Sequence, residues 1–151
     1  MTSLKERTMM IEWYWLLMMM VALHVFADFH LQGILANMKQ WRWWEKQEKE
    51  FVKEEIDRGA DRVDWVSCEK DYIPALLLHA FEWSFIVCIP LMWFVGMNWV
   101  GAVLVLLNTA YHAYVDNVKC NHLEINLVID QGLHLVQILC TLALWMAYTG
   151  V

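Results

Sequence analysis

Residues 98–119 read NWVGAVLVLLNTAYHAYVDNVK, and this stretch carries the two features that decide the fold. Its first part is an apolar run, and about 20 helical residues of this kind are enough to cross the hydrocarbon core of a bilayer. Its last part places His112 four residues before Asp116, which puts both side chains on one face of a helix. We therefore expect a transmembrane helix over 98–116 that ends in a polar pair.

Three further stretches have a similar length and apolar character, at about 10–32, 74–95 and 126–149. The 151-residue chain is 60% hydrophobic and has a mean hydropathy of +0.37, whereas a soluble globular domain is roughly 45–50% apolar. The sequence therefore predicts an all-α integral membrane four-helix bundle. Residues 1–151 are expected to form a single membrane domain in contact with the lipid bilayer.

The charged residues gather in the polar segment 37–72, between the first and second predicted spans. Glu45 with Lys49, and Glu54 with Arg58, have the i,i+4 spacing of ion pairs on a helix. We expect an extramembrane helical arm there. The chain has 17 acidic and 11 basic residues and a net charge of −6. Because a nucleic-acid-binding face needs an excess of basic residues, nucleic acid is not expected as a partner.

The arm begins with three tryptophans, Trp41, Trp43 and Trp44, beside basic residues. Indole rings are favoured at the headgroup level of a bilayer, so this part of the arm is expected to lie at the interface. A belt that only anchors the arm is the simpler interpretation. The alternative is a surface that binds a protein partner or forms a homo-oligomer.

The distribution of Lys and Arg predicts the orientation. With four spans, nine of the 11 basic residues lie on the side of the arm, and only Lys5 and Arg7 lie on the side of the termini. The positive-inside rule then places the arm in the cytoplasm and both termini outside.

Each aspartate in the apolar segments stands four residues from a histidine. Because successive spans alternate in direction, these pairs and one further histidine at the start of the second predicted span should meet in one layer on the side of the arm. Imidazole and carboxylate groups in this number point to a metal site, since an unpaired ionised Asp in a bilayer costs about 2.5–3.5 kcal/mol. The candidate metal ligands are His24, Asp28, His79, His112, Asp116, Asp130 and His134.

Seven ligands are more than one tetrahedral ion uses, so we expect one or two divalent ions. Zinc is favoured, with manganese or iron as weaker candidates. Two ions bridged by a carboxylate would suit displacement at a phosphoester. The alternative is that each pair only joins helices by hydrogen bonds or forms a proton relay.

Polar neighbours have candidate roles around this site. Glu82 is a candidate general base, and Lys39 and Lys119 are placed where an ammonium group can meet a substrate phosphate. The residues expected to orient ligands or hold substrate are Gln32, Asn108, Asn117 and Gln131. The four cysteines have no CxxC spacing, so no zinc ribbon is expected.

Four motifs resemble a known family: HVFADFHLQ at 24–32 followed by Lys39, LLLHA at 76–80, HAYVDNVK at 112–119 and DQGLH at 130–134. In order and spacing they resemble the bacterial and phage membrane-protein family known as "domain of unknown function 3307". The resemblance implies a bacterial inner-membrane location and brings no established activity. The pattern is more loosely similar to membrane-bound metal-dependent hydrolases. Relative to the compact core of the family, the arm is an insertion.

Two functions follow as hypotheses. The first is a membrane metal-dependent hydrolase acting on a phosphoester or related bond in a lipid or nucleotide-like substrate. The alternative is a non-enzymatic, phage-encoded membrane protein that binds a host or viral partner, with the His/Asp layer structural or ion-conducting.

Overall fold

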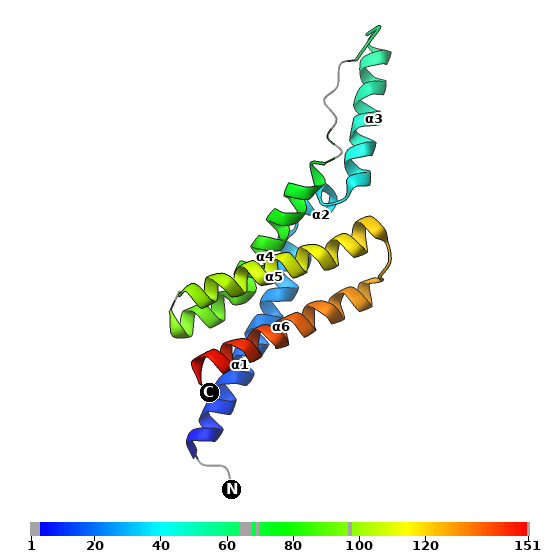
Figure 1. The fold of residues 1–151 in the computed structure, drawn as a ribbon. Helices are drawn as coiled ribbons and strands as arrows, with labels where there is room; N and C mark the ends of the chain where they lie inside the picture. The colour runs from blue at the N-terminus through cyan, green and yellow to red at the C-terminus, as the bar shows by residue number, and fades with distance from the viewer. Residues whose placement is uncertain (1–3, 64–67, 69, 97, 151) are drawn as a thin grey trace.

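A computed structural model of the chain describes residues 4–63, 68, 70–96 and 98–150, and these residues form helices, turns and loops without a strand (Figure 1). The α-helices are joined by loops, and two of them continue into a five-residue π-helical turn. In chain order the elements are α1 (Leu4–Phe26), η1 (Ala27–Leu31), α2 (Leu35–Met38), α3 (Trp41–Asp57), α4 (Tyr72–Val95), α5 (Trp99–Asn117), η2 (Val118–His122) and α6 (Leu127–Thr149).

The four long helices closely follow the four apolar stretches of the sequence. Three of them are long and apolar enough to cross a membrane, over Glu12–Leu31, Tyr72–Trp93 and Leu127–Thr149. Helix α5 is not in this set, and its second half carries polar residues that include Asn108, His112 and Asp116. The all-helical fold is confirmed, together with three candidate spans.

Asparagine caps and glycines set the ends of these helices. The side chain of Asn98 accepts a hydrogen bond from the backbone N–H of Gly101, and Asn126 accepts one from Ile129, each at 3.0 Å. Such caps satisfy N–H groups that have no partner within the helix. Helix α4 ends at Gly96, whose φ of +84° is strained for residues with a side chain. Because glycine adopts this backbone conformation readily, α4 can end at this position.

Each long helix packs against two neighbours or more. Helix α1 contacts α4 and α6, α5 contacts the same two helices, and α4 also contacts α6. In Figure 1, α5 and α6 run side by side while α1 crosses them at an incline. Gly101 of α5 faces Met92 of α4 and Trp145 of α6, and a Cβ at this position would lie 3.5 Å and 3.8 Å from them, in ordinary van der Waals contact.

An apolar core fills one half of the space between these helices. Its buried members come from α1, η1, α4, α5 and α6, and they are Leu16, Met20, Ala27, Trp83, Val87, Leu91, Leu104, Ile138, Leu142 and Trp145. Most of them precede His24 in α1 and His112 in α5, but follow His79 in α4 and His134 in α6. The core therefore lies on one side of the histidines in all four helices.

The predicted arm contains a helix, α3, which projects away from the long helices at the end opposite to the chain termini (Figure 1). Its ion pairs include Lys49 with Glu45 at 2.6 Å and Arg58 with Glu54 at 3.3 Å, as the spacing predicts. These side chains are largely exposed, so each pair contributes only about 0.3–0.5 kcal/mol. Residues 64–67 and 69 of the arm lie outside the described residues.

We predict that the long helices fold without α3. Glu45 and Lys70 line one surface pocket near the base of the arm, so a short Gly/Ser linker can replace residues 45–69. The truncated chain should still insert into membranes and unfold within about 1 kcal/mol of the intact chain, because the lost ion pairs are exposed. Unfolding in detergent micelles measures this difference. Failure of the truncated chain to insert would show that the arm belongs to the folding unit.

Candidate metal centre

The polar half of the space between the long helices holds a buried cluster of imidazole and carboxylate groups. Its members are each at most 6% exposed. They come from α1, η1, α4, α5 and α6, and they are His24, Asp28, His79, His112, Asp116, Asp130 and His134. The structure brings together every residue that was expected in the polar layer.

Both π-helical turns lie at this cluster. Asp28 is in η1, and η2 begins two residues after Asp116. A π-helical turn changes the direction of the side chains that follow it, and such turns are frequent at functional sites. Here η1 directs Asp28 into the cluster, and η2 directs Asn121 toward the α2–α3 loop, where it contacts Lys39 and Trp41.

The imidazole of His79 is surrounded by three other members of the cluster. Its Nε2 lies 3.6 Å from Asp28 Oδ1, 3.4 Å from Asp116 Oδ2 and 3.3 Å from His112 Nε2. His112 Nε2 is in turn 3.7 Å from the same oxygen of Asp116. Four potential ligand atoms from three segments of the chain, η1, α4 and α5, therefore face a common point.

The imidazole of His134 faces the opposite side of the same carboxylate. Its Nε2 lies 3.6 Å from Asp116 Oδ1 and 3.4 Å from Asp130 Oδ1. The ring also stacks on that of His112, with centroids 4.1 Å apart. Asp116 thus presents one oxygen to His79 and His112, and the other to His134.

These distances are typical of ligand atoms that share one ion. Two ligands at about 2.0–2.2 Å from a tetrahedral Zn²⁺ are about 3.3–3.6 Å apart. Both ring nitrogens of His134 and the Oδ1 of Asp130 are buried without a hydrogen-bond partner, a costly state unless something binds there. Three buried groups can hold a metal ion: Asp28 with His79 and His112, His112 with Asp116 and His134, and Asp28 with Asp130 and His134.

Lys39 and Lys119 form ion pairs with the cluster carboxylates. Lys39 Nζ lies 2.5 Å from Asp116 Oδ2, and Lys119 Nζ lies 2.5 Å from Asp130 Oδ2. The side chain of Lys39 is only 9% exposed, whereas that of Lys119 is 30% exposed. Their expected role was to meet a substrate phosphate. The structure instead engages both ammonium groups with carboxylates.

Gln32 contacts the Asp28 carboxylate of the cluster, whereas Asn117 contacts Asn121. Gln32 donates from Nε2 to Asp28 Oδ1 at 2.6 Å and also to the Asp28 backbone carbonyl. Asn117 accepts from Asn121, which donates to the Lys39 carbonyl at 3.1 Å and accepts from the Trp41 N–H at 3.0 Å. Sequence reasoning missed Asn121, although it fixes the backbone that carries Lys39.

Asn108 belongs to a separate polar group between α5 and α6. Its Oδ1 accepts from Gln137 Nε2 at 2.8 Å and lies 3.0 Å from the hydroxyl of Thr141. None of the hydrogen bonds within the described ranges connects these three side chains to the His/Asp cluster. The contacts of Asn108 therefore join two helices and do not orient the candidate ligands.

Glu82 and Cys120 contribute little to the site. Glu82 is half-buried, and no ion pair or hydrogen bond in the described part of the chain joins it to His79 or to another cluster member. Cys120, in η2, lies 3.7 Å from the Lys39 carbonyl. Burial raises the pKa of the Cys120 thiol to about 11, which keeps it protonated at neutral pH.

His24 differs from the other three histidines of the cluster. Trp83 Nε1 donates to His24 Nδ1 at 2.9 Å, and His24 Nε2 is 3.0 Å from Gln131 Oε1. Both ring nitrogens are therefore engaged by other side chains. Sequence reasoning missed Trp83, and the available signal was its position four residues after His79, on the same face of α4.

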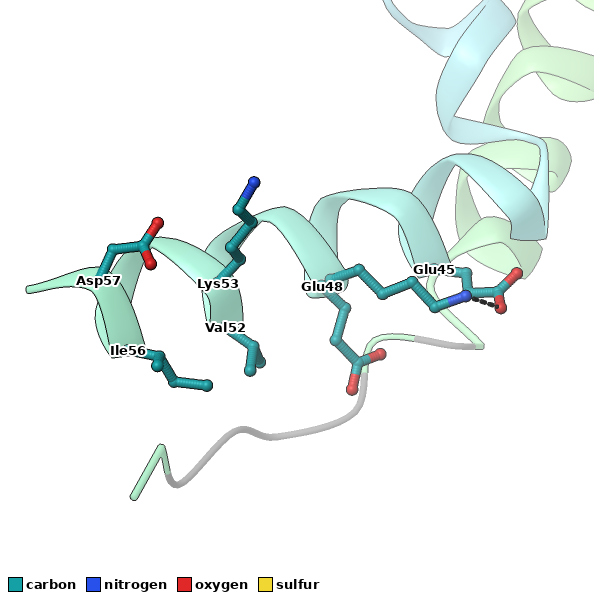
Figure 2. Close-up of a pocket in the computed structure, with 7 residues that line it drawn as sticks. Glu45, Glu48, Val52, Lys53, Ile56 and Asp57 are labelled. Atoms are coloured by element: carbon teal, nitrogen blue, oxygen red, sulfur yellow. Dashed lines mark hydrogen bonds and ion pairs between the residues drawn. The ribbon is translucent and has the colours of Figure 1, made fainter. Parts of the chain in front are cut away.

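A groove runs along α3 in the arm (Figure 2). Charged and aliphatic side chains line it, and Lys49 pairs with Glu45 at 2.6 Å. Its lining residues are Glu45, Glu48, Lys49, Val52, Lys53, Ile56 and Asp57, with no histidine or cysteine among them. The groove therefore lacks the chemistry of the buried cluster.

Comparisons of the chain with models of protein families, with curated proteins and with solved structures find no match.

The pairing of Lys39 predicts the effect of removing its carboxylate. In metal-free protein, Asp116→Asn should destabilise the fold by about 3–5 kcal/mol, because it leaves a buried ammonium without its partner. Adding Lys39→Met should recover most of this loss. Unfolding in detergent, followed as a double-mutant cycle, measures the coupling.

Asp130→Asn is the matched control for this cycle. Its partner Lys119 is more exposed, so water can solvate the released ammonium and the loss should be smaller. Equal losses for the two variants, with no recovery by Lys39→Met, would contradict a buried Lys39–Asp116 pair.

Proposed function

We propose that this chain is an integral membrane metalloenzyme in which α1, α4, α5 and α6 all cross the bilayer as a four-helix bundle. Three of the helices have the required length and hydropathy. Helix α5 has 19 residues and is therefore about 28 Å long, close to the hydrocarbon thickness of about 30 Å. It contacts both α4 and α6, so its polar groups are shielded from lipid by its neighbours.

The observation that carries the proposal is the position of Asp116 between two groups of imidazoles. Its Oδ2 faces His79 and His112, and its Oδ1 faces His134. A carboxylate placed in this way suits a bridge between two divalent ions. Asp28, His79 and His112 would complete one position, and Asp130 and His134 the other.

Zinc fits this set of nitrogen and oxygen ligands, with manganese or iron as alternatives. A pair of such ions supplies Lewis acidity for displacement at a phosphoester. The chain itself would hold its carboxylates ionised and oriented through Lys39, Lys119 and Gln32. The side chain of Lys119 is more exposed than that of Lys39, so its side of the cluster is the proposed approach for a lipid or nucleotide-like substrate.

A non-enzymatic role is the second candidate, and the two lysines favour it. Three aspartates and two lysines leave one negative charge in the cluster, which a single proton on one histidine neutralises without any metal. The layer would then be structural or ion-conducting. In that role a phage-encoded membrane protein would bind a host or viral partner through its arm.

Metal analysis by mass spectrometry separates these candidates. We expect two zinc ions per chain in detergent-purified protein, and one in His79→Ala or His134→Ala, because each variant removes a ligand from a different position. His122→Ala, which changes an exposed histidine, should keep both ions. Wild-type protein without stoichiometric metal would rule out the metalloenzyme.

Activity is tested on the same preparations. Metal-loaded protein should hydrolyse at least one member of a panel of lipid and nucleotide phosphoesters, and a chelator should abolish this activity. Bound metal without turnover on the whole panel would favour the structural or ion-conducting role.

The proposed location is a bacterial inner membrane, with the arm in the cytoplasm and both termini outside. We expect a cysteine introduced by Lys53→Cys, in a chain whose own cysteines are changed to Ser or Ala, to resist an impermeant thiol reagent in intact cells. Lysed cells provide the control for reactivity. Labelling in intact cells would place the arm outside and give the site access to envelope substrates.

A further inference from the structure

Trp83, His24 and Gln131 form a chain of hydrogen bonds. The donor at the start of the chain, Trp83, determines which atom donates in each later bond. The indole N–H of Trp83 is a donor only, and it donates to His24 Nδ1 at 2.9 Å. Nδ1 must therefore be unprotonated. In the neutral ring the proton is then on Nε2, which donates to Gln131 Oε1 at 3.0 Å.

The same bond fixes the orientation of the Gln131 amide. With Oε1 facing His24, the two N–H bonds of Nε2 are directed at carboxylates, Asp28 Oδ2 at 2.7 Å and Asp130 Oδ2 at 3.0 Å. A rotated amide would place its NH₂ group against the His24 N–H and its oxygen against two carboxylates. The hydrogen-bond chain therefore runs in one direction, from Trp83 through His24 and Gln131 to Asp28 and Asp130.

Gln131 engages the Oδ2 of each carboxylate, and the Oδ1 of each faces a histidine of the cluster. The Oδ1 of Asp28 also accepts a hydrogen bond from Gln32. With Oδ2 bound to Gln131, Asp28 Oδ1 faces His79 at 3.6 Å. With Oδ2 bound to Gln131 and Lys119, Asp130 Oδ1 has no hydrogen-bond partner and faces His134 at 3.4 Å. One amide thus orients carboxylates from η1 and α6 at the same time.

We propose that His24 is a positioning residue and not a metal ligand, and that Trp83, His24 and Gln131 together orient Asp28 and Asp130 toward the ions. This inference rests on the proposed metal centre. Hydrogen bonds from neighbouring side chains to ligating carboxylates commonly change metal affinity by about 10–100-fold. Trp83 also stacks on the ring of His112, at 4.3 Å between centroids and 21° between planes, so the same indole holds a candidate ligand directly.

Metal stoichiometry and affinity give the first test. At saturating Zn²⁺, His24→Ala should keep two ions per chain, unlike His79→Ala and His134→Ala. Trp83→Phe and the nearly isosteric Gln131→Met should weaken Zn²⁺ binding by about 10–100-fold, measured by competition with a chelator. Gln137→Leu is the matched control, because Gln137 is also a glutamine of α6 but contacts Asn108. It should leave the affinity unchanged.

Nitrogen NMR of histidine-labelled, metal-free protein gives a test that does not depend on metal binding. Wild-type His24 should show an unprotonated Nδ1 and a protonated Nε2, and Trp83→Phe should convert this signal to a mixture of tautomers. His24→Ala identifies the resonance, and Gln137→Leu should leave it in place.

The outcomes separate this inference from the proposed function. Loss of one ion in His24→Ala would make His24 a ligand and overturn the inference while leaving the metal centre intact. If wild-type protein binds no metal, the proposed function fails, and the nitrogen NMR spectrum of His24 alone tests the positioning chain. A single Nε2–H tautomer that Trp83→Phe disrupts then supports the positioning chain, and a mixture of tautomers in wild type overturns it. If Trp83→Phe does not fold, Gln131→Met tests the tautomer of His24 in the same way, because Gln131 binds its Nε2.

Discussion

The whole arrangement depends on keeping three buried carboxylates among apolar helices. Each of them is satisfied by a partner that reaches it from another segment: Lys39 for Asp116, Lys119 for Asp130, and Gln131 for Asp28. Removing such a partner would leave a buried charge unpaired, which costs several kcal/mol. The two segments that carry the lysines, the end of α2 and the turn η2, are therefore part of the site, even though they lie outside the long helices.

This need for partners explains how the base of the arm is held at one end of the long helices. Asn121, in the π-helical turn after α5, binds the backbone of Lys39 and Trp41 and so fixes the point from which the lysine reaches Asp116. Helix α3 begins immediately beyond this point and makes exposed ion pairs of its own. The base of the arm is therefore bound to the polar cluster. The rest of α3 extends away from the long helices (Figure 1).

Much of this architecture could be predicted from local spacing. The four apolar stretches, the i,i+4 pairs and the alternation of helix direction predicted the long helices and the single polar layer, and the His112–Asp116 and Asp130–His134 pairs do face each other. Spacing marked Trp83 as sharing the helix face of His79, and Gln131 was expected to orient ligands, but spacing did not pair either of them with His24. Trp83 and Gln131 are 59 and 107 residues away in sequence, and no periodicity encodes a contact of that kind. Glu82 is the opposite case. It lies one turn after His79 in α4, yet this proximity along the helix did not bring it into the cluster.

The difference between the two His-x-x-x-Asp motifs gives the site its asymmetry. Both motifs lie where a long helix passes into a π-helical turn. In α5 the histidine faces its own aspartate at 3.7 Å, whereas in α1 the histidine binds Trp83 and Gln131 and meets its aspartate only through the glutamine. Asp116 consequently lies between imidazoles on both of its oxygens, whereas each oxygen of Asp28 accepts a hydrogen bond from an amide, Oδ1 from Gln32 and Oδ2 from Gln131. Two nearly identical motifs thus yield one central carboxylate and one peripheral carboxylate, and sequence spacing alone does not distinguish them.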